Sequence, residues 1–124
     1  MHYIGKIDKS KIGLYSEKIK TEMVVLTDET KQHIYQSHPK DYKEIIENID
    51  TIVLNPDEVI QDIKNKDTIF LIGKLEKDNL NVIVRLNTNN NKQHPQNSVM
   101  SAWIIRNSNL IKLRQKNETI YKSE

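Results

Sequence analysis

The spacing of apolar residues changes once along this chain, and that change limits the folds the chain can adopt. An amphipathic stripe at helical spacing is formed by Tyr42, Ile45, Ile46 and Ile49. A turn signal follows at Asn55-Pro56-Asp57, and beyond it the apolar residues come in short runs rich in isoleucine and valine, which are typical of strands. Helices first and strands later predict an α+β fold.

A further helix is predicted before this stripe. Thr27-Asp28-Glu29 is a favourable helix start, because a threonine N-cap accepts from free N–H groups and acids oppose the helix dipole. This helix should end near Ser37-His38, since Pro39 disfavours helical dihedrals at the residue before it. Pro39 itself suits the first turn of the second helix. Residues 1–22 show weak periodicity and are expected to form an irregular or partly extended lead-in.

Four strands, a short helix and a closing strand are expected in the C-terminal half. The strands are Glu58–Asp62, Thr68–Gly73, Leu80–Asn87 and Ser98–Arg106, with a hairpin turn at Lys77-Asp78-Asn79 and a polar loop over Thr88–Asn97. The helix spans Ser108–Gln115 with Leu110, Ile111 and Leu113 inward, and the last strand spans Thr119–Tyr121. The expected architecture is N-terminal helices packed on an antiparallel sheet of four strands or slightly more, in a single domain over residues 1–124.

The composition excludes several classes of protein. The chain contains no cysteine, which excludes disulfides, thiolate metal sites and cysteine nucleophiles. No apolar run approaches the roughly 20 residues that span a bilayer, and the N-terminus lacks the layout of a signal peptide. With three glycines the chain has no glycine-rich phosphate loop. We therefore expect a soluble cytoplasmic protein without a membrane partner.

The charges are partitioned along the sequence, although the net charge is only +2. Residues 41–78 contain ten acids and five bases, whereas residues 79–117 contain six bases and no acid. The six bases are Arg85, Lys92, Arg106, Lys112, Arg114 and Lys116. This segment is interpreted as a binding surface for a polyanion, with a solvated basic face as the alternative.

Two histidines, His33 and His38, stand five residues apart at the end of the first predicted helix. Five helical steps separate their rings by roughly 140°, so the two need not share a face. Each is a candidate acid–base group, or else a surface histidine or a cap of the helix C-terminus. A zinc site from these two and His94 is a further alternative, but the chain offers no cysteine and no clear carboxylate at ligand spacing.

Two strand segments carry the remaining candidates. In Val82-Ile83-Val84-Arg85-Leu86, alternation places Arg85 beside Ile83 on one face, where it is either a phosphate clamp or the partner of an acid such as Asp62. Ser101 and Trp103 stand two apart and should share a strand face. Trp103 is either a core residue or a surface on which a base stacks.

The ordered blocks of the chain resemble the phage-associated barnase/EndoU/colicin/RelE-like (PBECR) nuclease domains. The first blocks are Val24–Glu29, His33, His38-Pro39 with Asp41-Tyr42, and Ile45–Asn48; the later ones are Val84–Thr88, Asn97-Ser98 leading to Ser101–Trp103, and Ile120–Lys122. This resemblance implies a BECR-like fold with helices packed on a four-stranded antiparallel sheet, and RNA cleavage in phage, plasmid or mobile-element conflict. It also implies that His33, His38, Arg85 and Ser101 are the polar site residues.

The resulting hypothesis is a metal-independent endoribonuclease, acting as a phage or mobile-element toxin or effector. The RNA 2′-hydroxyl would attack the adjacent phosphorus, with a histidine as general base and Arg85 and Ser101 stabilising the phosphoryl oxygens. The basic residues would bind the RNA backbone, and Trp103 or Tyr121 would stack a base. No cofactor is expected, and an immunity or antitoxin protein is a candidate partner. The rival hypothesis is a catalytically inactive nucleic-acid-binding or inhibitory protein on the same fold.

Overall fold

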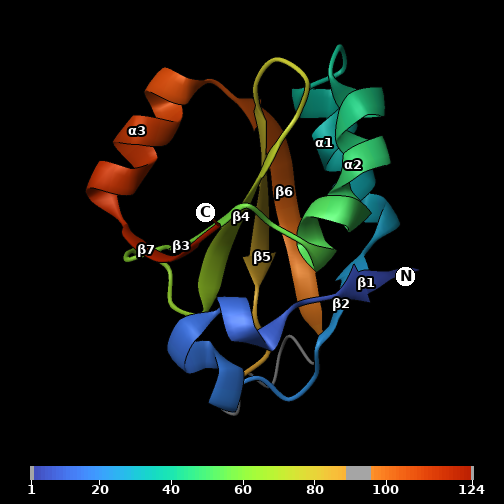
Figure 1. The fold of residues 1–124 in the computed structure, drawn as a ribbon. Coiled ribbons are helices and arrows are strands. Elements are labelled where there is room, and N and C mark those ends of the chain that lie inside the picture. The colour runs from blue at the N-terminus through green and yellow to red at the C-terminus, as the bar shows by residue number, and fades with distance from the viewer. Residues whose placement is uncertain (1, 89–95, 124) are drawn as a thin grey trace.

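The computed structural model describes residues 2–88 and 96–123, and within them the chain forms a seven-stranded sheet with three α-helices (Figure 1). The strands are β1 (His2–Lys6), β2 (Met23–Leu26), β3 (Glu58–Gln61), β4 (Thr68–Lys74), β5 (Asn79–Arg85), β6 (Asn97–Ile105) and β7 (Glu118–Lys122). The helices are α1 (Asp28–Ser37), α2 (Tyr42–Leu54) and α3 (Asn107–Lys116), with two short 3-10 helices, η1 (Lys9–Lys11) and η2 (Gly13–Glu17).

The expected fold, helices packed on a four-stranded antiparallel sheet, is wrong. The strand order is β1-β2-β6-β5-β4-β3-β7, and β2 lies parallel to β6 through the pairs Val24–Asn97 and Val25–Ser98. The predicted meander exists, because β3, β4, β5 and β6 pair in antiparallel fashion in sequence order. The sheet is larger because β1 and β2 extend it beyond β6 and because β7 pairs with β3.

The predicted limits of the helices are partly confirmed. Thr27 caps α1, since its hydroxyl oxygen accepts a hydrogen bond from the Thr30 amide, and α1 ends at Ser37 with His38 as its C-cap. The second helix begins later than expected. Pro39 lies in the connection, Asp41 is the N-cap and α2 starts at Tyr42.

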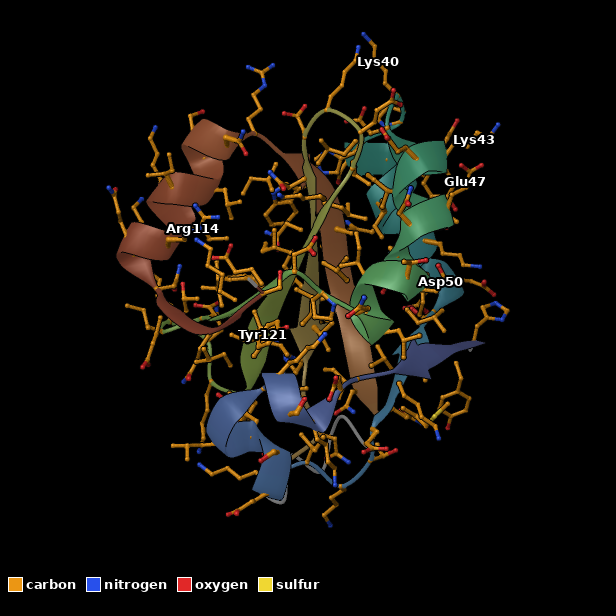
Figure 2. All side chains as sticks on the ribbon, in the orientation of Figure 1. Lys40, Lys43, Glu47, Asp50, Arg114 and Tyr121 are labelled. Atoms are coloured by element: carbon orange, nitrogen blue, oxygen red, sulfur yellow. The ribbon has the colours of Figure 1, made fainter. Side chains whose placement is uncertain are left out.

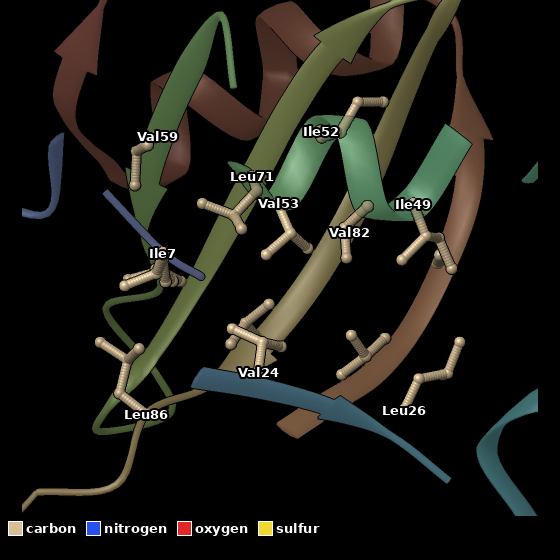
Figure 3. Packing of buried hydrophobic residues seen from close by; sticks show 14 of the residues in the cluster. Ile7, Val24, Leu26, Ile49, Ile52, Val53, Val59, Leu71, Val82 and Leu86 are labelled. Atoms are coloured by element: carbon tan, nitrogen blue, oxygen red, sulfur yellow. The ribbon is translucent and has the colours of Figure 1, made fainter. Parts of the chain in front are cut away.

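One face of the sheet is covered by α2. This helix carries its polar side chains outward, among them Lys43, Glu47 and Asp50 (Figure 2). Its buried stripe is Ile45, Ile49, Ile52 and Val53. These residues pack on the sheet side chains Leu71, Val82 and Val84, as Figure 3 shows for part of the cluster.

The first 22 residues contribute to this same core. Ile7, Ile12, Tyr15 and Ile19 are buried in the α2-side cluster, although the sequence indicated only an irregular or partly extended lead-in. The buried amide of Asn97 joins this segment to β6, because its nitrogen donates to the carbonyl oxygens of Thr21 and Met23. The lead-in is therefore part of the packed structure.

The opposite face of the sheet is partly covered by α3, which lies across the sheet from α2 (Figure 1). Leu110 is buried there with Ile60, Phe70 and Ile83, and Leu113 packs against this second cluster. Ile111 was expected to point inward and does not, since 49% of it is exposed. No helix within the described residues is long and apolar enough to cross a membrane.

Candidate functional site

The α3-side face of β5 and β6 carries three of the predicted site residues. Alternation along β5 places Ile83 and Arg85 on this face and Val82 and Val84 in the α2-side core, as predicted. Across the β5–β6 ladder, Ser101 pairs with Ile83 and Trp103 pairs with Asn81, so both lie on the same face. The structure therefore brings Arg85, Ser101 and Trp103 onto one surface, which we call the Arg85 surface.

A β-bulge in β6 adds a second serine to this surface. The register shifts between Ile83, which pairs with Ser101, and Val84, which pairs with Val99, so Met100 is the extra residue. Because of this insertion, Ser98 and Ser101 face the same side although they stand three residues apart. Ser98 lies directly opposite Arg85, and Thr68 of β4 lies opposite Arg85 on the other side. Arg85 is thus flanked in register by two hydroxyl side chains.

His38 reaches this face around the edge of β6. Among the described residues, β2 pairs with β6 at Asn97 and Ser98, and α1 contacts β6. The backbone N–H of His38 donates to the carbonyl oxygen of Ile34, which fixes the residue as the helix cap. Its half-buried ring lies 6.4 Å from the Trp103 ring, centroid to centroid, at an interplanar angle of 34°. His38 therefore stands at the C-cap position of α1, and its ring lies beside Trp103.

His33 is exposed on α1, one residue before the buried Ile34. The alternative zinc site also needs His94, which lies outside the described residues. No group of three or more histidine, aspartate or glutamate side chains in the described part of the chain is placed to hold a metal ion.

The basic residues are divided between different surroundings. Lys112 and Lys116 are exposed on α3. Arg114 points from α3 toward the sheet and donates two hydrogen bonds of 2.8 Å to the carboxylate of Glu58, which is 3% exposed (Figure 2). This pairing raises the pKa of Arg114 further. Arg114 therefore links α3 to β3 through this ion pair. The remaining basic residue, Lys92, lies outside the described residues.

Arg106 and Tyr121 lie away from the Arg85 surface. Arg106 lines a pocket of about 560 Å³ together with Asp41, Glu44, Glu76, Asp78 and Lys77. The excess of carboxylates makes this pocket unfavourable for a phosphate. Tyr121 pairs with Val59 and packs on the α2-side core, with the Lys11 ammonium 5.0 Å from its ring centroid.

Sequence reasoning missed Asn81, Ser98 and Thr68. Strand alternation alone could have placed Asn81 on the face of Arg85, but Ser98 could not be found in this way because the bulge interrupts the alternation. Asn81 is fully buried, and neither polar atom of its side chain has a hydrogen-bond partner among the described residues.

The family relationship agrees with the resemblance seen in the sequence. Residues 1–122 match the family described as phage-Barnase-EndoU-ColicinE5/D-RelE like nuclease2, PBECR2. The chain has no significant match among curated proteins or among solved structures. Since the match covers nearly the whole chain, this protein belongs to the PBECR2 family of phage-associated nucleases, whose substrates are nucleic acids.

Proposed function

We propose that this protein is an endoribonuclease that cleaves RNA by attack of a 2′-hydroxyl on the adjacent phosphorus. The observation that carries the proposal is the shared surface of Arg85, Ser101, Trp103 and, at its edge, His38. An arginine fork binds a phosphate, hydroxyls donate to its oxygens, and an aromatic ring stacks a base. These are the groups that a single-stranded RNA substrate requires.

In the proposed reaction, the 2′-oxygen forms a bond to phosphorus while the bond from phosphorus to the 5′-oxygen breaks. His38 takes the proton of the 2′-hydroxyl, and His33 is the candidate for the acid that protonates the leaving 5′-oxygen. The products are a 2′,3′-cyclic phosphate and a free 5′-hydroxyl. Arg85 and Ser101 stabilise the charge that develops on the non-bridging oxygens. The reaction needs no metal ion or cofactor.

Substrate binding would use the same side of the molecule. Trp103 stacks one base, and Lys112 and Lys116 on α3 bind the backbone. Arg106 is less suited to binding the backbone, because its pocket is lined by carboxylates. Arg114 is bonded to Glu58. We place the activity in the cytoplasm, as a phage or mobile-element toxin or effector that an immunity or antitoxin protein would restrain.

The test is incubation of the purified protein with total RNA in the presence of EDTA. Degradation to fragments that end in a 2′,3′-cyclic phosphate is the expected result. Intact RNA together with a gel shift would instead support the rival hypothesis, a binding or inhibitory protein that has lost catalysis.

A further inference from the structure

Asn81 occupies an unusual position in the middle of the sheet. It lies on β5 between two neighbours in register, Ile72 of β4 and Trp103 of β6. The residue is 0% exposed, and both its amide nitrogen and its amide oxygen lack a hydrogen-bond partner among the described residues. A buried amide normally has such partners, because leaving it without them raises the free energy of the folded state.

Other asparagines of the sheet do have hydrogen-bond partners for their side chains. Asn79 stands two residues earlier on the same strand and face, and its amide nitrogen donates to the side-chain oxygen of Asn107 at 2.9 Å. The buried amide of Asn97 is also fully used, with bonds to three backbone groups. Within the described sheet, asparagine side chains are therefore satisfied at comparable positions and unsatisfied at Asn81.

Asn81 lies on the same face of the sheet as the Arg85 surface. It lies two residues before Ile83 and four before Arg85 on one strand face, and its partner in register is Trp103. On the other side, Ile72 and Asn79 line a cleft of about 240 Å³ between α3 and the sheet, which also contains Leu110 and Arg114. Asn81 thus lies between the stacking tryptophan and the wall of a cleft.

We propose that Asn81 is a specificity-determining residue, which hydrogen-bonds the edge of a nucleobase that enters beside Trp103. This inference rests on the proposed function, in that the ligand is single-stranded nucleic acid. A carboxamide presents one donor and one acceptor side by side, which matches the paired donor and acceptor on a base edge. The base supplies the two hydrogen bonds that the buried amide lacks in the free protein.

Entry of a base requires the Trp103 ring to move. This half-buried ring packs against the second hydrophobic cluster, and it lies 6.4 Å from the His38 ring in a tilted arrangement. In this proposal, displacement of the ring gives the base access to the amide. Stacking and edge recognition then act on the same base.

The test uses 2′-O-methyl dinucleotides with adenine, cytosine, guanine or uracil bases, which cannot be cleaved by 2′-hydroxyl attack. Binding is followed by the fluorescence of Trp103, the only tryptophan of the chain. We expect the wild-type dissociation constants to differ by about tenfold or more between the best and worst base. Asn81→Leu should reduce this range to about twofold, while raising Tm, because an apolar group of similar shape replaces an unsatisfied one.

Asn79→Leu is the matched control, on the same strand and face. It should keep the base preference without raising Tm, because it removes a satisfied amide. Asn81→Val is the second variant if Asn81→Leu does not fold, and it should lose the preference in the same way. Equal wild-type affinity for the four bases, or an Asn81 variant that keeps the wild-type preference, would overturn the proposal. Because these ligands are not cleaved, failure to degrade RNA would count against the nuclease function alone.

Discussion

Arg85 lies between Thr68 and Ser98 in the register of the central sheet, two residues from the pair formed by Ile83 and Ser101. If it stabilises the phosphoryl oxygens, Arg85→Ala should lower kcat/KM for RNA by about two to three powers of ten, as loss of one transition-state donor does. Arg85→Lys should recover only part of the rate, because an ammonium lacks the bidentate fork. Initial cleavage rates measure the effect, and circular dichroism checks the fold. A fully active alanine variant would assign Arg85 a structural role.

Tyr15 connects the N-terminal segment to the β3–β4 loop. Its phenol oxygen accepts a hydrogen bond from the backbone N–H of Asp67, and burial raises its pKa above the ordinary value of 10.0. The folded state therefore holds the phenolic proton more tightly than the unfolded state does. The associated stability is complete below about pH 10 and is lost as the pH rises through the folded-state pKa.

Alkaline unfolding measures this linkage. The free energy of unfolding of the wild type should fall above about pH 10, and Tyr15→Phe should fall less steeply because the titrating group is gone. The phenylalanine variant should also lose about 1 kcal/mol near neutral pH with the hydrogen bond to Asp67. Identical slopes above pH 10 would show that burial does not hold the proton of Tyr15.

At the scale of elements, α3 is held on the sheet by both apolar and ionic contacts. Leu110 is buried against the sheet, and Arg114 binds the buried carboxylate of Glu58. Arg114→Met should destabilise the fold by about 2–3 kcal/mol, because it leaves a buried charge without a partner. The double variant Glu58→Gln, Arg114→Met should recover a large part of this loss. Chemical denaturation measures both, and a double variant no more stable than Arg114→Met would contradict the account.

The elements with a strong local pattern could be predicted from the sequence. The capping residue Thr27, the stripe of α2 and the runs that form β3 to β6 are local signals, and the structure confirms them. The parallel pairing of Val24 with Asn97 joins residues more than 70 positions apart and has no local signal. The edge strand β1 was not recognised because its exposed residues show no clear alternation.

The same distinction applies to the candidate site. Strand alternation predicted that Arg85 shares a face with Ile83 and that Ser101 shares a face with Trp103. The register of β5 and β6 confirms both predictions. The contact between His38 and Trp103 and the ion pair between Glu58 and Arg114 arise only from tertiary packing. Within the basic segment, the pattern of charge could not show that Arg114 is bonded to Glu58.

At the scale of the whole molecule, the partition of charge in the sequence carries over only in part to the two faces of the sheet, because Arg106 lies in an acidic pocket and Arg114 is paired with Glu58. The acid-rich part includes α2, whose outward side carries Glu47 and Asp50 (Figure 2), and the acid-free part forms β5, β6 and α3. Because α2 and α3 lie on opposite faces of the sheet, we propose that a polyanion binds on the side of α3. Arg85 and Trp103 lie on that side.

This arrangement predicts the salt dependence of RNA binding. Lys112 and Lys116 are one helical turn apart on the exposed side of α3, and each would release counterions from a bound phosphate. Replacing both with glutamine should weaken binding for all sequences and flatten the plot of log K against log salt by up to about 2. The matched control replaces Lys9 and Lys43, two exposed lysines on η1 and α2, and should leave the slope unchanged. Equal slopes for both variants would leave the partition of charge without a role in binding.

The most direct test of ribonuclease action is cleavage of an oligoribonucleotide that carries a single 2′-deoxy substitution at the position cut in the unmodified strand. Attack by the 2′-hydroxyl predicts that this one substitution abolishes cleavage there, while the unmodified strand yields a 2′,3′-cyclic phosphate in the presence of EDTA. A deoxy substitution at a neighbouring position is the control and should leave the cut intact. Cleavage of the substituted position at the unmodified rate would contradict the proposed chemistry.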